Sequence, residues 1–198
     1  MTETGATTEV GELGERAQDA LLAAGFRRDP ELFTAVYERY FRAIYRYVAG
    51  RLDVQVADDI AAETFLVAFG QRDRFDPGRG SLQAWLFGIA TNLVARYRRA
   101  EARHYGALAR AVPEPAAGSH ESRVVALVAA SGRRAQLARA LAGLSPGQRD
   151  VVLLVALGQL SHEEVAQALG ISVGTVGSRL SRARAKLRHA IDEEAIDG

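Results

Sequence analysis

The 198-residue sequence has no cysteine, which excludes disulfide bonds, thiol catalysis and cysteine-ligated zinc within the chain. Its four histidines are scattered with no pair at the spacing of metal ligands, so we expect no metal site. No hydrophobic run exceeds seven residues, the length of Val151–Leu157, whereas a membrane-spanning helix needs roughly 20. Residues 1–25 contain five acidic residues and one basic residue, unlike a secretory signal. We therefore expect a cytoplasmic protein without membrane insertion.

Lysine is almost absent, since Lys186 is the single lysine among 25 basic residues. The other basic residues are arginines, whose planar guanidinium groups bind phosphate with two hydrogen bonds. The charges are segregated, although the chain nets only +1. Residues 172–191 hold five bases and no acid, residues 52–71 hold four acids and no base, and residues 77–100 hold four bases and no acid. Acidic and basic helices therefore alternate, which explains the near-zero net charge.

Hydrophobic residues recur at the helical spacing of 3.6 residues through most of the chain. This spacing predicts helices over residues 32–48, 53–70 and 82–97, and shorter ones over 134–141 and 151–157. Ser145 and Ser161 each begin a capping-box pattern, with Gln or Glu three residues later. No alternation of polar and apolar residues typical of a strand extends beyond four residues, so the sequence predicts an all-α fold.

The helical pattern breaks near the middle of the chain, at the stretch "VPEPAAGSHES", which holds two prolines and a Gly-Ser pair. We interpret this stretch as part of a flexible linker between two small helical domains. The predicted organisation is an acidic N-terminal segment, a first domain, a linker, a second domain and a short tail, at residues 1–25, 26–104, 105–133, 134–192 and 193–198.

The second domain has the spacing of a helix-turn-helix. Ala166 is small where two helices would cross, and Gly170 lies where the turn needs a positive φ. The inward-facing positions of the last helix would be Val176, Leu180, Ala183 and Leu187, and the outward-facing ones Gly174, Ser178, Ser181 and Ala185. A plain pair of packed helices could show the same apolar spacing. It would not need an acid-free second helix with five bases, so we predict that this helix enters a DNA major groove.

The basic stretch at residues 77–100 also carries aromatic residues. Trp85 and Tyr97 could stack on unpaired bases, since aromatic rings beside arginines suit single-stranded nucleic acid. They also lie on the apolar stripe of their predicted helix, so they could equally belong to the core. Composition leaves both interpretations open.

Three segments in order, "DDIAAETFLVAF", "FDPGRGSLQAWLFGIATNLVARYRR" and "ALAGLSPGQRDVVLLVALGQLSHEEVAQALGISVGTVGSRLSRARAKLR", resemble the extracytoplasmic-function sigma factors of bacterial RNA polymerase. The similarity covers residues 29–104 and 134–191. It implies a first domain that binds core polymerase and opens the minus-ten promoter element, and a second domain that binds the minus-thirty-five element. The implied partners are the polymerase β′ clamp helices and β flap, duplex and single-stranded promoter DNA, and an anti-sigma factor. It implies no enzymatic activity, cofactor or metal.

The resemblance also assigns roles to residues. An acidic helix would bind polymerase, a basic partner, through Asp59, Ile60 and Glu63, and we add the neighbouring Asp58 to this predicted site. The minus-ten element would be bound by Trp85, Asn92, Arg96, Arg98 and Arg99, with Asn92 at the pocket of an extruded base. For the minus-thirty-five element the resemblance implies Ser178, Ser181 and Arg182. The helical period places Arg179 and Arg184 further round the same helix, where they suit phosphates, and we add Thr175 to this predicted site. Ala62 and Gly177 depart from the family pattern, which usually has Gln and often a basic residue at those positions.

Two other classes of protein remain as alternatives. A transcriptional activator with a similar helix-turn-helix would bind DNA without acting as a sigma subunit. Its usual receiver domain would show alternating strands and helices, which residues 29–104 do not. An enzyme has less support, because the sequence has no phosphate-binding loop and no Ser-His-Asp or Cys-His arrangement.

Overall fold

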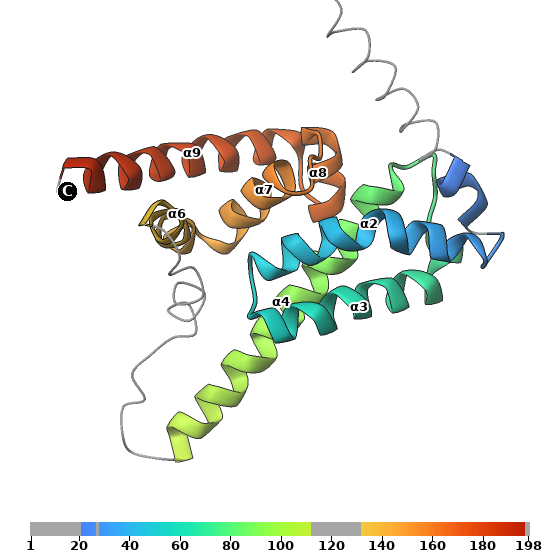
Figure 1. Cartoon of the computed structure of the whole chain (residues 1–198), viewed down its shortest axis with the longest axis horizontal. Helices are drawn as coiled ribbons and strands as arrows, with labels where there is room; N and C mark the ends of the chain where they lie inside the picture. The colour runs from blue at the N-terminus through green and yellow to red at the C-terminus, as the bar shows by residue number, and fades with distance from the viewer. Residues whose placement is uncertain (1–20, 27, 112–131, 197–198) are drawn as a thin grey trace, which may run out of the picture.

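The computed structural model describes residues 21–26, 28–111 and 132–196, and every helix or strand assigned in these ranges is a helix (Figure 1). The prediction of an all-α fold is therefore confirmed. After a short helical stretch at residues 21–26 come α2 (Leu32–Ala49), α3 (Val54–Gly70), η1 (Arg72–Arg74), α4 (Leu82–Ala111), α6 (Gly132–Ala142), α7 (Pro146–Ala156), α8 (His162–Leu169) and α9 (Val173–Ile196). None of the described helices has the length and apolar character needed to cross a membrane.

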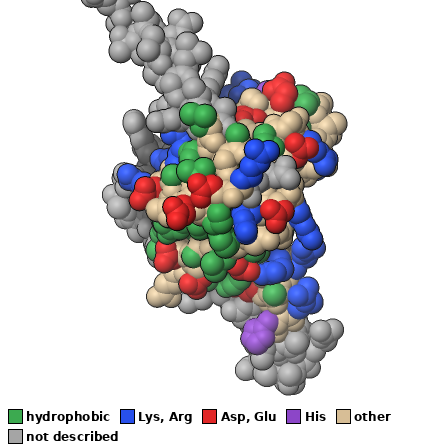
Figure 2. Space-filling view, turned by 90° about the vertical axis from the view of Figure 1, so that its right-hand side faces the viewer, with side chains coloured by type: hydrophobic (Ala, Val, Ile, Leu, Met, Phe, Trp, Pro, Cys, Tyr) green, Lys and Arg blue, Asp and Glu red, His purple; other side chains and the backbone are tan. Residues whose placement is uncertain are grey.

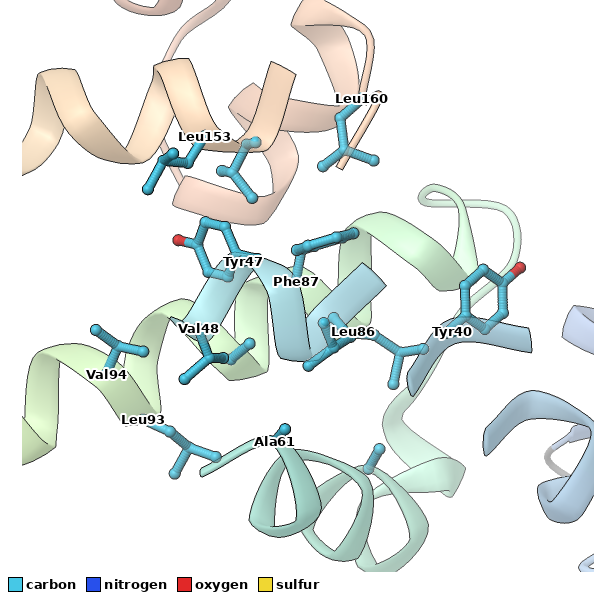
Figure 3. Packing of buried hydrophobic residues seen from close by; sticks show 14 of the residues in the cluster. Tyr40, Tyr47, Val48, Ala61, Leu86, Phe87, Leu93, Val94, Leu153 and Leu160 are labelled. Carbon is cyan, nitrogen blue, oxygen red and sulfur yellow. The ribbon is translucent and has the colours of Figure 1, made fainter. Parts of the chain in front are cut away.

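The N-terminal domain is built from α2, α3 and α4, which pack on one another through their apolar stripes (Figures 1 and 3). Each helix buries residues three or four positions apart, the spacing that places side chains on one face. The buried set includes Val36, Tyr40 and Ile44 of α2, Ala57, Ala61 and Phe65 of α3, and Leu86, Ala90 and Leu93 of α4. Small alanines on α3 let the neighbouring helices approach closely, which brings α3 and α4 side by side.

Helix α4 begins as the sequence predicts and ends later. The hydroxyl oxygen of Ser81 accepts a hydrogen bond from the backbone N–H of Ala84 at 3.1 Å, which caps the first turn. The helix then continues to Ala111, well beyond Tyr97, so the first residues of the predicted linker are helical. No proline interrupts the sequence before Pro113, and a single glycine is tolerated in a helix. The proline-rich stretch that follows lies outside the described residues.

The C-terminal domain contains α6 to α9 and the predicted helix-turn-helix. Gly170 ends α8 with φ 62° and ψ 36°, the left-handed conformation that favours glycine. Ser161 and Glu164 form the predicted capping box of α8, and Ser172 caps α9 by accepting from the N–H of Thr175 at 3.1 Å. The inward-facing residues Val176, Leu180 and Ala183 are buried, which confirms the predicted helical phase of α9.

Candidate interfaces on α3, α4 and α9

The outer face of α9 is the candidate for duplex DNA. Ser181, Arg182 and Arg184 are exposed on it. Ser178 is half-buried and donates its hydroxyl to the carbonyl of Thr175 at 3.0 Å, whereas the hydroxyl of Thr175 contacts that of Ser172 at 2.8 Å. The first turn of α9 is therefore held by its own hydroxyls, while the next turns present serine and arginine to solvent.

Arg179 lies apart from this face. It is half-buried, and its guanidinium group crosses the backbone at the start of α7, where a Cβ added to Gly147 would lie 3.0 Å from Arg179 Nη1. Its side chain therefore packs between α9 and α7. Among the residues predicted to bind the minus-thirty-five element, Arg179 is the one that the structure directs into the domain.

A shallow hollow lies beside α9 at Gly177. Ser181 and Arg184 of α9 and His162 at the start of α8 line it. A Cβ added to Gly177 would meet no atom within 4 Å, so a larger side chain fits there without displacing a neighbour. The departure from the family pattern at Gly177 thus leaves open space in the middle of the predicted DNA-binding face.

Helix α4 carries the second candidate surface. Asn92, Arg96 and Arg99 are all exposed, and their spacing of four and three residues places them in one row along the helix. The Arg96 guanidinium pairs with the carboxylate of Glu63 on α3, and the Nε of Arg99 donates to the carbonyl of Ala95 at 3.2 Å. The row has the donors and acceptors that bind phosphates and a base edge.

The other two residues predicted to bind the minus-ten element lie elsewhere on α4. Trp85 is half-buried in an aromatic cluster, with ring centroids 6.1 Å from Phe26 and 5.3 Å from Phe75. Arg98 is half-buried and donates to the carbonyl of Arg51 at 2.6 Å. For Trp85, the structure favours the core interpretation left open by composition, because two aromatic neighbours already flank its ring.

The exposed face of α3 is the third candidate surface. Asp58 and Asp59 are exposed on it, and Glu63 follows one turn later in its pair with Arg96. Ile60 is only 7% exposed and packs in the core, so the structure does not bring its side chain to this surface. Three of the four residues predicted to bind polymerase therefore share one acidic face, and the fourth supports the face from beneath.

Large apolar side chains accompany these acids, and none of them is among the site residues predicted from the sequence. Leu66 is 72% exposed on α3, and Phe69 and Tyr37 are each more than a third exposed nearby. The Tyr37 ring lies edge-on to Phe65 of α3, so α2 and α3 together form this surface. On the face drawn in Figure 2, hydrophobic side chains gather with Asp and Glu on one side, and Lys and Arg line the other. The available signal was Leu66 itself, four residues after Ala62 on the polar side of α3.

No group of three histidine or carboxylate side chains that could hold a metal occurs among the described residues. The three surfaces instead offer hydrogen-bonding, charged and apolar groups. Their chemistry is that of binding, with separate basic and acidic faces.

Comparison with known proteins identifies both domains. The sigma-70 region 2 family matches residues 32–104, and the sigma-70 region 4 family matches residues 134–187. The chain is 37% identical over 143 residues to the RNA polymerase sigma factor CnrH of Cupriavidus metallidurans, which covers 70% of this chain and 74% of CnrH. It is 29% identical over 192 residues to the ECF RNA polymerase sigma factor SigC of Mycobacterium tuberculosis, which covers 93% of this chain and 96% of SigC.

Two solved structures have similar folds. CnrH in complex with the cytosolic domain of CnrY matches with a TM-score of 0.63 and 29% identity, over 88% of this chain and 97% of that chain. The sigma factor RpoE in complex with the anti-sigma factor NepR, from Bartonella quintana, matches with a TM-score of 0.65 and 25% identity, over 81% and 96% of the two chains.

The chain belongs to the extracytoplasmic-function sigma factors, with sigma-70 regions 2 and 4. Sigma factors are non-enzymatic subunits that bind core RNA polymerase and promoter DNA, and the function of this chain is therefore transcription initiation. The resemblance drawn from the sequence is confirmed. The α2–α4 domain is called region 2 below, and the α6–α9 domain is called region 4.

Proposed function

We propose that the three surfaces divide the work of a sigma subunit. The acidic and apolar face of α3 binds core polymerase, the exposed row on α4 holds the opened minus-ten strand, and the outer face of α9 binds the minus-thirty-five duplex. The observation that supports this division is the segregation of charge, which gives α3 an acidic face and the adjacent α4 a basic one. Residues 26–104 and 134–192 are the proposed functional units, with α4 extending the first into the linker.

The α3 face suits a helical, basic partner such as the clamp helices of the polymerase β′ subunit. Asp58 and Asp59 supply charge, and Leu66 and Phe69 supply apolar area that water would leave on binding. Charged groups at the rim chiefly set specificity and association rate, whereas buried apolar anchors supply affinity. Region 4 would make the second contact, with the β flap.

The α4 row suits a single strand. An Asn side chain offers a donor and an acceptor, so Asn92 can pair with the edge of a base that has left the stack. Arg96 and Arg99, one turn and two turns further along, can hold the phosphates of the same strand. Trp85 and Arg98 are proposed to shape the helix from its inner side, because their contacts lie within region 2.

The α9 face suits duplex DNA. Ser178, Ser181 and Arg182 lie where a recognition helix meets base edges, and Arg184 lies toward the phosphates. Thr175 and Arg179 are proposed to orient the helix, since both engage groups of their own domain.

The structural relatives also suggest a regulator. RpoE is bound by the anti-sigma factor NepR, and CnrH is bound by the cytosolic domain of CnrY. We infer that this chain is held by an anti-sigma factor in the same way. The cytoplasm is its proposed location, because core polymerase and promoter DNA are found there.

Reconstitution tests the proposed function. The purified chain and core polymerase should form a complex that transcribes from a matched promoter, and neither component should do so alone. Permanganate should detect unpaired thymines at the minus-ten element of the complex. A chain that bound the minus-thirty-five duplex but never co-eluted with core polymerase would instead be an activator.

A further inference from the structure

The segment at residues 21–26 lies outside the part of the chain that matches the region 2 family, which begins at residue 32, yet it belongs to the core of region 2. Phe26 of this segment is fully buried. The N–H groups of Arg28 and Asp29 both donate to the carbonyl of Gly25 at 2.9 Å, so the backbone turns sharply there before it enters α2. The segment is therefore held against region 2 by its buried side chain and by this turn.

The Phe26 ring packs where the chain enters α4. Its centroid lies 6.1 Å from that of Trp85 and 6.4 Å from that of Phe75, and both contacts are edge-on. The centroids of Phe75 and Trp85 are 5.3 Å apart, and Phe75 is only 2% exposed. In Figure 1 the segment, in dark blue, lies beside the loop that leads into α4. We call the rings of Phe26, Phe75 and Trp85 the aromatic wall.

The aromatic wall lies at one end of the exposed row on α4. Trp85 precedes Asn92 by seven residues, which is two helical turns and places both residues on the same side of the helix. Ile89 lies between them and is half-buried. Helical side chains lean toward the N-terminus of their helix, so the Asn92 amide covers the turn at Ile89. The surface over Ile89 is therefore bounded by an amide at one end and by the aromatic wall at the other.

This surface suits one unpaired base. A base that has left the stack has a polar edge, which an amide can pair with, and apolar faces, which aromatic rings stabilise. Arg96 and Arg99 follow further along α4, where they suit the phosphates of the same strand. The side chains along α4 thus change in order from aromatic to amide to cationic, in agreement with the apolar, polar and anionic parts of a nucleotide.

We propose that residues 21–26 complete the base site on α4, and that Phe26 is a positioning residue that acts through Trp85. Phe26 is fully buried and cannot touch DNA itself. It holds the Trp85 ring and the loop that begins at Phe75, and so sets the width of the surface on which the base lies. The proposal rests on the proposed function of α4, because it concerns the same minus-ten strand.

The fluorescence of Trp85 tests the packing. Trp85 is the single tryptophan, so the tryptophan emission of the free, full-length chain comes from the aromatic wall. Phe26→Ala should shift this emission to longer wavelength, because water reaches the indole ring, while circular dichroism shows retained helical content. The matched control Phe41→Ala removes a ring of the same size that stacks on Tyr37 and Tyr45 instead, and it should leave the emission unchanged. Unshifted emission of the Phe26→Ala chain would overturn the proposal.

Oligonucleotide binding tests the base site. The complex of the chain with core polymerase is titrated with two labelled single strands of the minus-ten element. One strand is intact, and the other is abasic at the position where Asn92→Ala loses discrimination. The wild-type complex should bind the intact strand more tightly. Phe26→Ala should reduce this preference by about fivefold, the low end of what one stacked base contributes. Its affinity for the abasic strand should stay the same, because Arg96 and Arg99 are untouched.

The preference for the intact strand separates a positioning role from a general loss of stability. A destabilised region 2 would bind both strands more weakly by the same factor, and that result would overturn the proposal. Phe26→Leu keeps an apolar side chain and should restore part of the preference, and it provides the same test if the Phe26→Ala chain does not fold. Phe41→Ala should keep the wild-type preference.

The outcomes also distinguish this proposal from the proposed function. A wild-type preference in both Phe26 variants would overturn the positioning role and leave the proposed function of α4 intact. A wild-type complex that bound the intact and abasic strands equally would contradict the base site itself.

Discussion

Single buried side chains stabilise a domain at places where backbone groups would otherwise lack hydrogen-bond partners. Arg149 of α7 is 6% exposed, and its guanidinium group donates to the carbonyls of Leu141, Ala142 and Leu144 at 2.9, 2.7 and 3.3 Å. Two of these carbonyls lie in the last turn of α6, where the helix has no backbone donors left to offer, and that of Leu144 lies in the turn that follows. The planar side chain of Arg149 therefore fixes the path of the backbone from α6 to α7.

Removing this arginine should destabilise region 4. Arg149→Ala should lower the free energy of unfolding by about 2–4 kcal/mol, because several hydrogen bonds to a charged group are lost. Arg149→Lys should recover only part of the loss, since an ammonium group lacks the planar fork. Urea denaturation of the full chain measures both, with exposed Arg42→Ala expected to stay within about 0.5 kcal/mol of wild type. Equal effects of Arg149→Ala and Arg42→Ala would contradict the prediction.

Asn92 can be tested as a reader of the minus-ten strand. Asn92→Ala should leave polymerase binding and minus-thirty-five binding unchanged, and should remove discrimination at one position of a single-stranded minus-ten oligonucleotide. Promoter opening should fall, and a premelted bubble should restore part of it, because unstacking a base costs a few kcal/mol in the duplex. Permanganate footprinting measures opening.

The matched control for this variant is Gln55→Ala, which removes an exposed amide from α3. It should behave as wild type in opening and in oligonucleotide binding. Normal opening by the Asn92→Ala protein would mean that Asn92 binds only water or its own helix.

At the scale of helices, much of the fold could be predicted from the sequence. The caps at Ser161 and Ser172, the left-handed turn at Gly170 and the inward-facing residues of α9 all follow from local rules, and the structure confirms them. The sequence predicts the end of α4 too early, because weak periodicity after Tyr97 hides a helix that continues to Ala111. Local signals decide where helices begin, and the absence of a breaker decides how far they run.

The candidate surfaces were less predictable, because a side chain's direction depends on tertiary packing. Helical period predicts that Ser181 faces outward with Arg182 flanking it, and both residues are exposed. It could not show that Arg179 crosses Gly147 or that Arg98 reaches the carbonyl of Arg51. Both are contacts between helices distant in sequence, and an arginine's long stem can reach either solvent or a neighbouring helix.

Helix α3 can be tested as the polymerase-binding element. Asp59→Arg together with Glu63→Arg should abolish co-elution with core polymerase while the helical content stays intact. Each single variant should also be measured, because Glu63 pairs with Arg96 and its replacement disturbs α4 as well. A control with the same change in charge, Asp73→Arg with Glu163→Arg, should still co-elute. Polymerase binding that survives the double reversal would remove α3 from the interface.

Helix α9 can be tested as the duplex-binding element through salt dependence. Arg182→Ala should weaken binding to a minus-thirty-five duplex and reduce the slope of log affinity against log salt by about 0.9 if one phosphate contact is lost. If Arg182 contacts a base instead, binding should weaken by about 1–3 kcal/mol with relaxed specificity at one position. Gly177→Arg should tighten binding, since the hollow beside Gly177 has room for the side chain. Unaltered affinity of both variants would mean that α9 faces a protein.

The whole molecule combines two domains, one shared core and a connection whose central part, residues 112–131, lies outside the described residues. Its stability therefore depends on both the two domains and the contact between them. Cutting the connection separates these contributions, because the domains then stay together only through contacts such as those of α4 with α8 and of Arg51 with Asp150.

Limited proteolysis makes this measurable. The prolines and glycine at residues 112–122 predict the most protease-sensitive interior segment, and a Glu-specific protease can cut there after Glu114 or Glu121. The two fragments should elute together in size-exclusion chromatography. The same cut in the Asp150→Arg chain should give fragments that elute separately. With a protease of broad specificity, first cuts inside residues 82–97 would contradict the domain organisation.

The ion pair between Glu63 and Arg96 has a consequence for the order of assembly. Glu63 lies on the proposed polymerase face and Arg96 on the proposed strand-binding row, so each side chain is shared between two binding events. When polymerase binds Glu63, Arg96 becomes free to bind the DNA strand, and when the strand binds Arg96, Glu63 becomes free to bind polymerase. By thermodynamic reciprocity, polymerase would then favour strand binding as much as the strand favours polymerase. Since an exposed pair contributes about 0.2–1 kcal/mol, this cooperativity amounts to less than about sixfold.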